Sequence, residues 1–202
     1  MSYKNIVFDV GDVLADFCYE KLMRNLGFSE EAVEFLSANM VVTEYWHELD
    51  LGKWTGKDAL PHFLKLYPQY EKEIRAFWAN TDKLIEEYPY SEPMVKRLKD
   101  AGYGVYILSN YPTDTAEQHW PTFKFLPLAD GYIISGFEKI TKPDAEIYRL
   151  LESRFGIKLS ESLFVDDRQV NIDGANAVGM DAVLFTGYEN LVQAFHEKGI
   201  QY

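Results

Sequence analysis

The sequence predicts an α/β protein: a Rossmann-like, doubly wound parallel sheet with an inserted helical cap. Short apolar runs alternate with helix-length segments along the chain, a pattern typical of parallel strands joined by crossover helices. Polar residues directly follow several of these runs, at the sheet edge where open α/β folds bind ligands. The first crossover is much longer than the roughly 30 residues of a simple βαβ unit, which indicates an insertion.

The predicted strands are short apolar runs, and they lie at residues 5–9, 104–109, 131–135, 163–166 and 182–186. The segments between the later strands have the length and periodicity of helices, which we expect at residues 91–101, 144–155 and 171–178. The first of these helices carries Pro93 in its first turn and is followed by Gly102, as is common at helix ends.

The segment 16–88 separates the first two predicted strands and carries apolar residues at helical spacing, with little strand signal. We therefore expect a helical cap domain at 16–88, and a core domain made of residues 1–15 and 89–202. The segment is rich in aromatic residues, and at helical spacing most of these are expected to form the core of the cap.

The composition excludes several classes of partner. The chain has 202 residues, is 47% hydrophobic and carries a formal net charge of −12, which argues against nucleic acid or an anionic membrane as the main partner. Its single cysteine, Cys18, excludes an internal disulfide, and we expect a cytoplasmic protein without a signal peptide or membrane span. The sequence leaves open whether it is a monomer or a small homo-oligomer.

Four chemically distinctive elements recur in a fixed order along the predicted core. In chain order they are Asp9, the pair Ser109 and Asn110, Lys142, and the pair Asp166 and Asp167. All except the lysine lie at the carboxyl ends of predicted parallel strands. Phosphoryl transfer through an aspartyl-phosphate needs this set: a carboxylate nucleophile, groups that hold phosphate oxygens, a lysine, and further carboxylates for Mg²⁺.

With these motifs the chain resembles the haloacid dehalogenase-like (HAD) hydrolases over nearly its full length. The motifs that carry the resemblance are Phe-Asp-Val-Gly-Asp-Val-Leu at 8–14, Leu-Ser-Asn at 108–110, Lys-Pro-Asp at 142–144 and Phe-Val-Asp-Asp at 164–167. The long first crossover matches the family's helical type of cap. Within the family the chain is most similar to small bacterial sugar-phosphate phosphatases, which share the Asp-x-Gly form of the first motif.

The resemblance implies a nucleophile and a Mg²⁺ site. Asp9 would attack phosphorus and would also bind the metal, and the backbone carbonyl of Gly11 would be a second ligand. Asp167 is the preferred direct carboxylate ligand, with Asp166 supporting it or binding through water.

The resemblance also implies a phosphate site, and a small phosphorylated metabolite, favoured to be a sugar phosphate, as the substrate. Ser109 and the backbone N–H of Asn110 would bind the phosphate. Lys142 would offset the charge of both the phosphate and the nucleophile.

One position departs from the family pattern. Most of the family's phosphatases carry a second aspartate, two residues after the nucleophile, as general acid–base, whereas this chain has Gly11. Asp12 is expected to point elsewhere, because adjacent side chains in an extended segment face opposite ways. The leaving oxygen would then take its proton from water or from a cap residue such as His47, or would leave without one.

Two other readings stay open at this point. A 2-haloacid dehalogenase uses the same nucleophile on carbon but does not need the acidic pair 166–167, so metal dependence separates it from a phosphatase. A catalytically quiet module that binds a ligand or partner is supported by the missing general acid. A phosphomutase is disfavoured, because it needs the group that Gly11 replaces.

Overall fold

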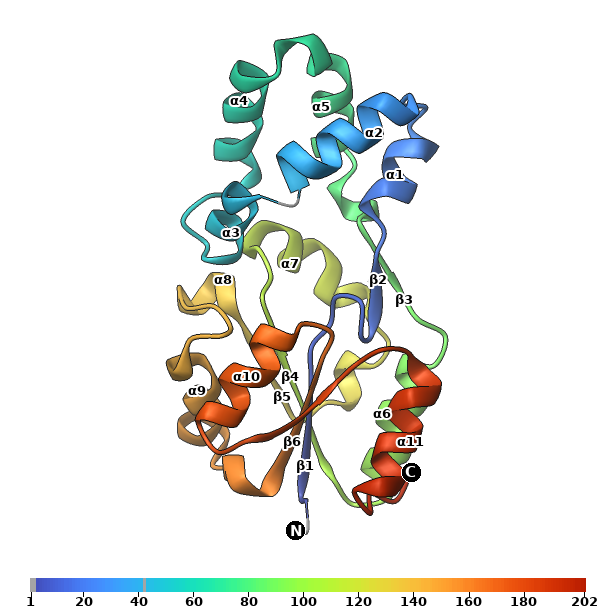
Figure 1. Cartoon of the computed structure of the whole chain (residues 1–202), viewed down its shortest axis with the longest axis vertical. Helices are drawn as coiled ribbons and strands as arrows, with labels where there is room; N and C mark the ends of the chain where they lie inside the picture. Colours follow the sequence, from blue (N-terminus) through green and yellow to red (C-terminus); the bar gives the residue numbers. More distant parts are fainter. Residues whose placement is uncertain (1–2, 42) are drawn as a thin grey trace.

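The computed structural model describes residues 3–41 and 43–202 and confirms the predicted fold class (Figure 1). All neighbouring strands of the five-stranded sheet are parallel, in the order β5-β4-β1-β6-β7. The five predicted strands are confirmed, with ends shifted by at most two residues: β1 (Asn5–Phe8), β4 (Gly104–Ser109), β5 (Gly131–Ile134), β6 (Ser162–Asp166) and β7 (Asp181–Leu184).

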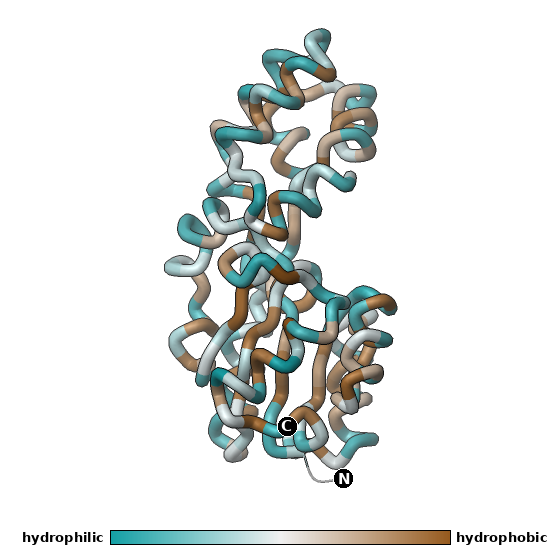
Figure 2. The backbone as a smooth tube through the Cα atoms, turned by 90° about the vertical axis from the view of Figure 1, so that its left-hand side faces the viewer, coloured by the Kyte–Doolittle hydropathy of each residue, from teal (hydrophilic) through white to brown (hydrophobic). Residues whose placement is uncertain are grey.

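Helices cover both faces of the sheet, which explains why its central strands are apolar throughout. Side chains alternate along a strand, so Ile6 and Phe8 of β1 enter one apolar cluster and Val7 enters another. The helices on the first face are α6 (Ser91–Asp100) and α11 (Tyr188–Glu197), and those on the second are α9 (Ala145–Phe155) and α10 (Gln169–Ala177). The brown tube of the strands in Figure 2 follows this buried layer.

The strand order places a crevice at one end of the sheet. From β1 the chain proceeds to β4 and then β5 on one side, and it then crosses to β6 and β7 on the other. The carboxyl ends of β1, β4 and β6 therefore lie side by side at a reversal of strand order, where open α/β sheets bind ligands.

Between β1 and α6 the described residues form five α-helices that lie above the carboxyl edge of the sheet (Figure 1): α1 (Tyr19–Asn25), α2 (Glu30–Leu36), α3 (Glu44–Asp50), α4 (Gly56–Leu66) and α5 (Glu71–Trp78). They share an apolar cluster of their own, with Met23, Leu36, Phe63 and Phe77 fully buried in it. A π-helical turn at Ser37–Val41 follows α2.

A short antiparallel ribbon, which the sequence analysis missed, joins these helices to the sheet. It consists of β2 (Ala15–Phe17) and β3 (Ile85–Glu87). Each strand has only three residues, too few for an alternating pattern to show. The chain beside the ribbon is fixed to the core by the hydroxyls of Tyr90 and Ser91, each of which donates to a backbone carbonyl at 2.6 Å.

Two further short helices of the core contact the helical segment: α7 (Thr113–His119) and α8 (Ser135–Glu138). The remaining turns are 3₁₀ helices at Pro68–Tyr70, Thr81–Lys83, Trp120–Thr122, Leu126–Leu128 and Leu159–Glu161. None of the helices in the described part of the chain is long and apolar enough to cross a membrane.

The loop after α3 packs closely against the core. The Ser135 hydroxyl donates to the carbonyl of Asp50 at 2.6 Å, and Lys139 donates to the carbonyl of Gly52. Gly52 has φ +59, and a Cβ atom there would lie 2.1 Å from the carbonyl oxygen of Gly136. Only glycine fits this approach, so the backbone holds the end of α3 at the core.

Candidate active site

A cavity of about 180 Å³ lies between the carboxyl edge of the sheet and the helical segment. The core lines it with Gly11 and with polar residues, among them Asp9, Asn110, Asp167 and Arg168. The helical segment and ribbon line it mainly with apolar side chains, including Phe17, Trp46, Leu84 and Ile85, and with one carboxylate, Asp50. The cavity thus has a charged floor and a largely apolar roof.

Asp9 follows the last residue of β1 and is only 8% exposed. Its Oδ1 accepts the N–H of Val10 at 2.7 Å and lies 3.0 Å from the Nζ of Lys142. Burial raises the pKa of Asp9 to about 7, and the nearby Lys142 opposes that shift. Because the carboxylate form depends on neighbouring cations, a metal ion beside Asp9 would favour it further.

Lys142 is fully buried between two carboxylates. Its Nζ lies 3.0 Å from Asp9 Oδ1 and donates to Asp166 Oδ2 at 2.7 Å. Burial opposes the charged form, but the two carboxylates outweigh it, so the pKa of Lys142 is raised. The lysine therefore stays protonated and links the ends of β1 and β6.

Asp166 is fully buried, and its oxygens already have partners. Besides Lys142, they accept the side-chain amide of Asn171 at 2.9 and 3.0 Å and the backbone N–H of Arg168 at 2.8 Å. Tyr148 in turn donates to the carbonyl of Asn171 at 2.8 Å. These contacts fix the orientation of Asp166 and leave Asp167 to face the cavity.

Ser109 and Asn110 end β4 beside this group. The Asn110 side chain exchanges two hydrogen bonds with the backbone of Lys142, at 2.8 and 3.0 Å, and so positions the lysine. The Ser109 hydroxyl is buried and has no hydrogen-bond partner among the described residues. A buried polar atom without a partner is costly, so this hydroxyl is available to a ligand bound beside the neighbouring Asn110, which lines the cavity.

Asp9, Asp166 and Asp167 offer carboxylate oxygens that lie within 4.8 Å of one another. Burial and the charge of Asp166 raise the pKa of Asp167 to about 6, and Lys142 opposes that shift. Oxygen ligands at this spacing suit Mg²⁺, which takes one or two carboxylates and keeps several waters. The donor set therefore fits the metal, with Asp9 and Asp167 facing the cavity and Asp166 behind them.

Gly11 lines the cavity and has room for a side chain. Its φ lies outside the left-handed region, and a Cβ atom there would meet nothing within 4 Å. The following residue, Asp12, has φ +56, and its Oδ1 accepts the N–H of Phe17 at 3.2 Å. The Asp12 carboxylate is thus engaged with the ribbon and does not replace a side chain at position 11.

Four predicted site residues do not line the cavity. Ser109, Lys142 and Asp166 are buried next to residues that do, whereas His47 is exposed. On α3 the residues facing the cavity are Trp46 and Asp50, which are four apart and so lie on one helix face. The sequence analysis missed Asp50, because its spacing from Trp46 is informative only once the cavity-facing side of α3 is known. Burial raises the pKa of Asp50 to about 7, with Asp9 contributing.

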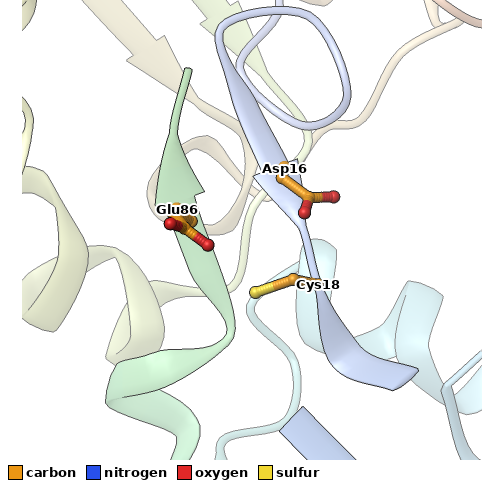
Figure 3. A group of neighbouring side chains, drawn as sticks. All are labelled: Asp16, Cys18 and Glu86. Atoms are coloured by element: carbon orange, nitrogen blue, oxygen red, sulfur yellow. The ribbon is translucent and has the colours of Figure 1, made fainter. Parts of the chain in front are cut away.

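A second group of possible ligands lies on the ribbon, where oxygen and sulfur atoms of Asp16, Cys18 and Glu86 approach within 4.8 Å (Figure 3). Glu86 is exposed and pairs with Lys21. Burial raises the pKa of the Cys18 thiol, which disfavours the thiolate that a metal would require. None of these three residues lines the cavity.

Comparison with known proteins identifies the family. Residues 3–179 match the model of the haloacid dehalogenase-like hydrolases, so the chain belongs to this hydrolase family and the resemblance seen in the sequence is confirmed. Sesquiterpene phosphatase astK of Aspergillus oryzae is 26% identical over 180 residues, 89% of this chain and 88% of that protein. (S)-2-haloacid dehalogenase 4A of Burkholderia cepacia is 27% identical over 191 residues, 90% of this chain and 82% of that protein.

Solved structures share the fold. The magnesium complex of the HAD family enzyme bt-2542 from Bacteroides thetaiotaomicron has a TM-score of 0.75 and 22% identity, covering 96% of this chain and 99% of that one. The same enzyme has also been solved with magnesium and inorganic phosphate, with a TM-score of 0.69 and 21% identity. L-2-haloacid dehalogenase from Xanthobacter autotrophicus has a TM-score of 0.67 and 18% identity, covering 99% of this chain and 85% of that one.

Proposed function

We propose that this protein is a Mg²⁺-dependent phosphatase that transfers the phosphoryl group of a small metabolite to Asp9. The observation that carries the proposal is the group formed by Asp9, Asp166 and Asp167, with the buried Lys142 between the first two. A nucleophilic carboxylate, a fixed cation and a further carboxylate at the cavity are the parts that phosphoryl transfer requires.

In this mechanism the Asp9 carboxylate attacks phosphorus, the bond to the leaving oxygen breaks, and water then hydrolyses the aspartyl-phosphate. Lys142 stabilises the charge on Asp9 and on the phosphoryl oxygens. The Ser109 hydroxyl, together with the backbone N–H of Asn110, would hold those oxygens. Mg²⁺, held by Asp9, Asp167 and the Gly11 carbonyl with support from Asp166, would supply charge neutralisation in a chain of net charge −12.

The substrate is proposed to be a small phosphorylated metabolite, with sugar phosphates favoured. A cavity of about 180 Å³ accepts a small molecule, and Trp46 and Phe17 provide apolar surface for the carbon faces of a sugar ring. Residues 16–88 would act as the cap that excludes water during transfer. A panel of phosphorylated metabolites, including sugar phosphates and a short isoprenyl phosphate, tests this preference.

The second candidate is a 2-haloacid dehalogenase, which the relative from Burkholderia cepacia favours. In a dehalogenase Asp9 would attack carbon, and a metal-binding pair at 166 and 167 would have no use. The orientation of Asp167 toward the cavity, beside Asp9, supports the phosphatase instead. Halide release from 2-chloropropionate that persists in chelator would favour the dehalogenase.

Removal of Mg²⁺ is expected to lower phosphatase activity on the order of 10³-fold, because the metal supplies several kcal/mol of charge stabilisation. The measurement is p-nitrophenyl phosphate hydrolysis in excess chelator, followed by Mg²⁺ titration. Full recovery with Mg²⁺ is the expected control. Undiminished turnover in chelator would contradict the metal assignment.

The stability of the metal-free protein is expected to fall as pH rises from about 4 to about 7 through the titration of Asp9, Asp50 and Asp167. Their folded pKa values are raised, so in this window the folded state holds more protons than the unfolded state. Mg²⁺ binds the ionised carboxylates, and its stabilising effect should grow through the same window. Melting temperatures with and without Mg²⁺ at pH 5 and pH 8 test this, and an equal shift at both would contradict it.

Gly11→Asp is expected to change which phosphates are hydrolysed rather than to raise every rate. The open space around position 11 admits the side chain without strain. An added acid helps leaving groups that need a proton, whereas the added negative charge weakens anion binding for all substrates. The measurement is kcat/KM on phenyl phosphate and on p-nitrophenyl phosphate. Equal falls on both, with the fold intact, would show that position 11 gives no access to the leaving oxygen.

A further inference from the structure

With glycine at position 11, the oxygen of the leaving group lacks its usual proton donor. Another group at the cavity must therefore supply the proton. The titratable side chains that line the cavity are Asp9, Asp12, Asp50, Tyr111, His119, Asp167 and Arg168. Asp9 and Asp167 are assigned to attack and to the metal, and a guanidinium stays protonated at any working pH. Three other side chains besides Asp50 then remain.

Each of these three is already engaged. Asp12 accepts from the ribbon at Phe17. Both ring nitrogens of His119 form hydrogen bonds: Nδ1 with the Tyr111 hydroxyl at 2.5 Å and Nε2 with the backbone carbonyl of Thr81 at 2.7 Å. Burial raises the pKa of Tyr111 well above its usual range, so its hydroxyl neither loses its proton nor leaves this chain of contacts readily.

Asp50 is the remaining group, and its backbone is fixed at the cavity. It is the last residue of α3, and its carbonyl accepts the Ser135 hydroxyl at 2.6 Å. The oxygen of Ser135 in turn accepts the backbone N–H of Tyr111 at 2.9 Å. Tyr111 directly follows Ser109 and Asn110, the pair proposed to bind phosphate. Within residues 3–41 and 43–202, the Asp50 carboxylate itself has no hydrogen-bond partner, so it is free to meet a substrate atom.

We infer that Asp50 is the general acid–base of this enzyme and that the cap supplies the proton which the core motif lacks; this rests on the proposed phosphatase function. In the first half-reaction Asp9 forms its bond to phosphorus, the phosphorus–oxygen bond to the leaving group breaks, and that oxygen takes the proton of Asp50. In the second, water attacks phosphorus and gives a proton back to Asp50, which frees phosphate and regenerates Asp9.

The position opposite Asp9 suits this role. Asp9 lies on the floor of the cavity and Asp50 on the cap side, and in-line displacement directs the leaving oxygen away from the nucleophile, toward the cap. Burial and the charge of Asp9 raise the pKa of Asp50 to about 7, against the opposing charges of Lys142 and Arg168. An acid in that range is protonated in part at neutral pH and can both give and take a proton.

The test compares Asp50→Asn with the unchanged enzyme on two probes, phenyl phosphate and p-nitrophenyl phosphate. Phenolate leaves with a conjugate-acid pKa of about 10, as for tyrosine, and needs a proton, whereas p-nitrophenolate leaves without one. We expect kcat/KM to fall on the order of 10²-fold for phenyl phosphate and to change little for p-nitrophenyl phosphate. Stopped-flow traces on the second probe should show one equivalent of nitrophenolate released rapidly, then slow turnover, because hydrolysis at Asp9 has lost its base.

Three variants make the result specific. Glu48→Gln removes a carboxylate from the same helix that pairs with Lys53, and it should leave the ratio between the two probes unchanged. Asp50→Glu should recover part of the phenyl phosphate activity. Gly11→Asp in the Asp50→Asn background should also recover part of it, by returning an acid from the core side.

The outcomes separate this inference from the proposed function. Equal losses on both probes in Asp50→Asn, without a burst and with an unchanged melting temperature, would overturn the role of Asp50. No hydrolysis of either probe by the unchanged enzyme with Mg²⁺ would instead overturn the phosphatase proposal. A variant that fails to fold is recognised from its melting curve, and Asp50→Glu then decides. Partial activity on phenyl phosphate with little change on p-nitrophenyl phosphate would support the acid, and equal losses on both probes would contradict it.

Discussion

Asp9→Asn should abolish phosphatase activity, by on the order of 10⁴-fold or more, because it removes the attacking atom at nearly constant volume. The measurement is steady-state hydrolysis of p-nitrophenyl phosphate with Mg²⁺, together with trapping of a beryllium fluoride adduct on the unchanged enzyme. Activity near that of the unchanged enzyme would mean that water attacks phosphorus directly and that no aspartyl-phosphate forms.

The same variant should fold, and its stability gives an independent check. Burial raises the pKa of Asp9 to about 7, so ionising this carboxyl in the metal-free protein at pH 8 costs free energy. The neutral amide avoids that cost, and Lys142 keeps its contact with Asp166 at 2.7 Å. We therefore expect the metal-free melting temperature at pH 8 to rise or stay equal, and the gain from Mg²⁺ to shrink. A large fall in melting temperature would show that the contact of Asp9 with Lys142 outweighs its burial.

The sheet could be predicted from sequence because its strands are buried on both faces. Val7 and Phe8 face opposite sides, yet both are fully buried, so an uninterrupted apolar run marks the strand. The polar residues that follow these runs could then be predicted to lie together, because the carboxyl ends of parallel strands meet at one edge of the sheet. The contacts of Lys142 with Asp9 and Asp166 agree with that placement, although 24 residues separate the lysine from Asp166.

The side of the site formed by the helical segment could not be predicted in the same way. Which residues of α3 face the cavity depends on how the helix docks, and docking is set by contacts such as Ser135 with the Asp50 carbonyl and Gly52 against Gly136. These contacts join residues far apart in the sequence and leave no local pattern. His47, which we expected as one possible proton donor, therefore lies at an exposed position outside the cavity lining.

The ribbon β2–β3 was missed for a different reason. Its three-residue strands are too short for periodicity, and the chain just before β2 is held by the hydroxyls of Tyr90 and Ser91, which come after the helical segment in the sequence. Its effect on the site is nevertheless direct, since Phe17 and Ile85 line the cavity and the N–H of Phe17 binds Asp12. The ribbon thus determines that Asp12 is unavailable as an acid.

Lys142→Met should be the most destabilising of these substitutions and should also cost activity. The side chain is completely buried, and its loss leaves Asp166, also completely buried, without a cation. Removing one partner of a buried pair costs about 3–5 kcal/mol, which for a chain of this size lowers Tm by roughly 6–20 °C. Loss of one fixed charge at the phosphoryl group should lower kcat on the order of 10²–10³-fold. Thermal melting and p-nitrophenyl phosphate hydrolysis measure the two effects.

A matched surface variant and a double variant separate charge from packing. Lys96→Met removes a lysine that pairs with Asp100 but is 63% exposed, and exposed pairs contribute about 0–1 kcal/mol. Its Tm should barely change. Adding Asp166→Asn to Lys142→Met removes the stranded anion and should recover part of the lost stability, while activity stays low because the phosphoryl group still lacks its cation. If the double variant melts no higher than Lys142→Met alone, the destabilisation comes from lost packing, such as the contact of the lysine with the Phe164 ring, and not from an unpaired Asp166.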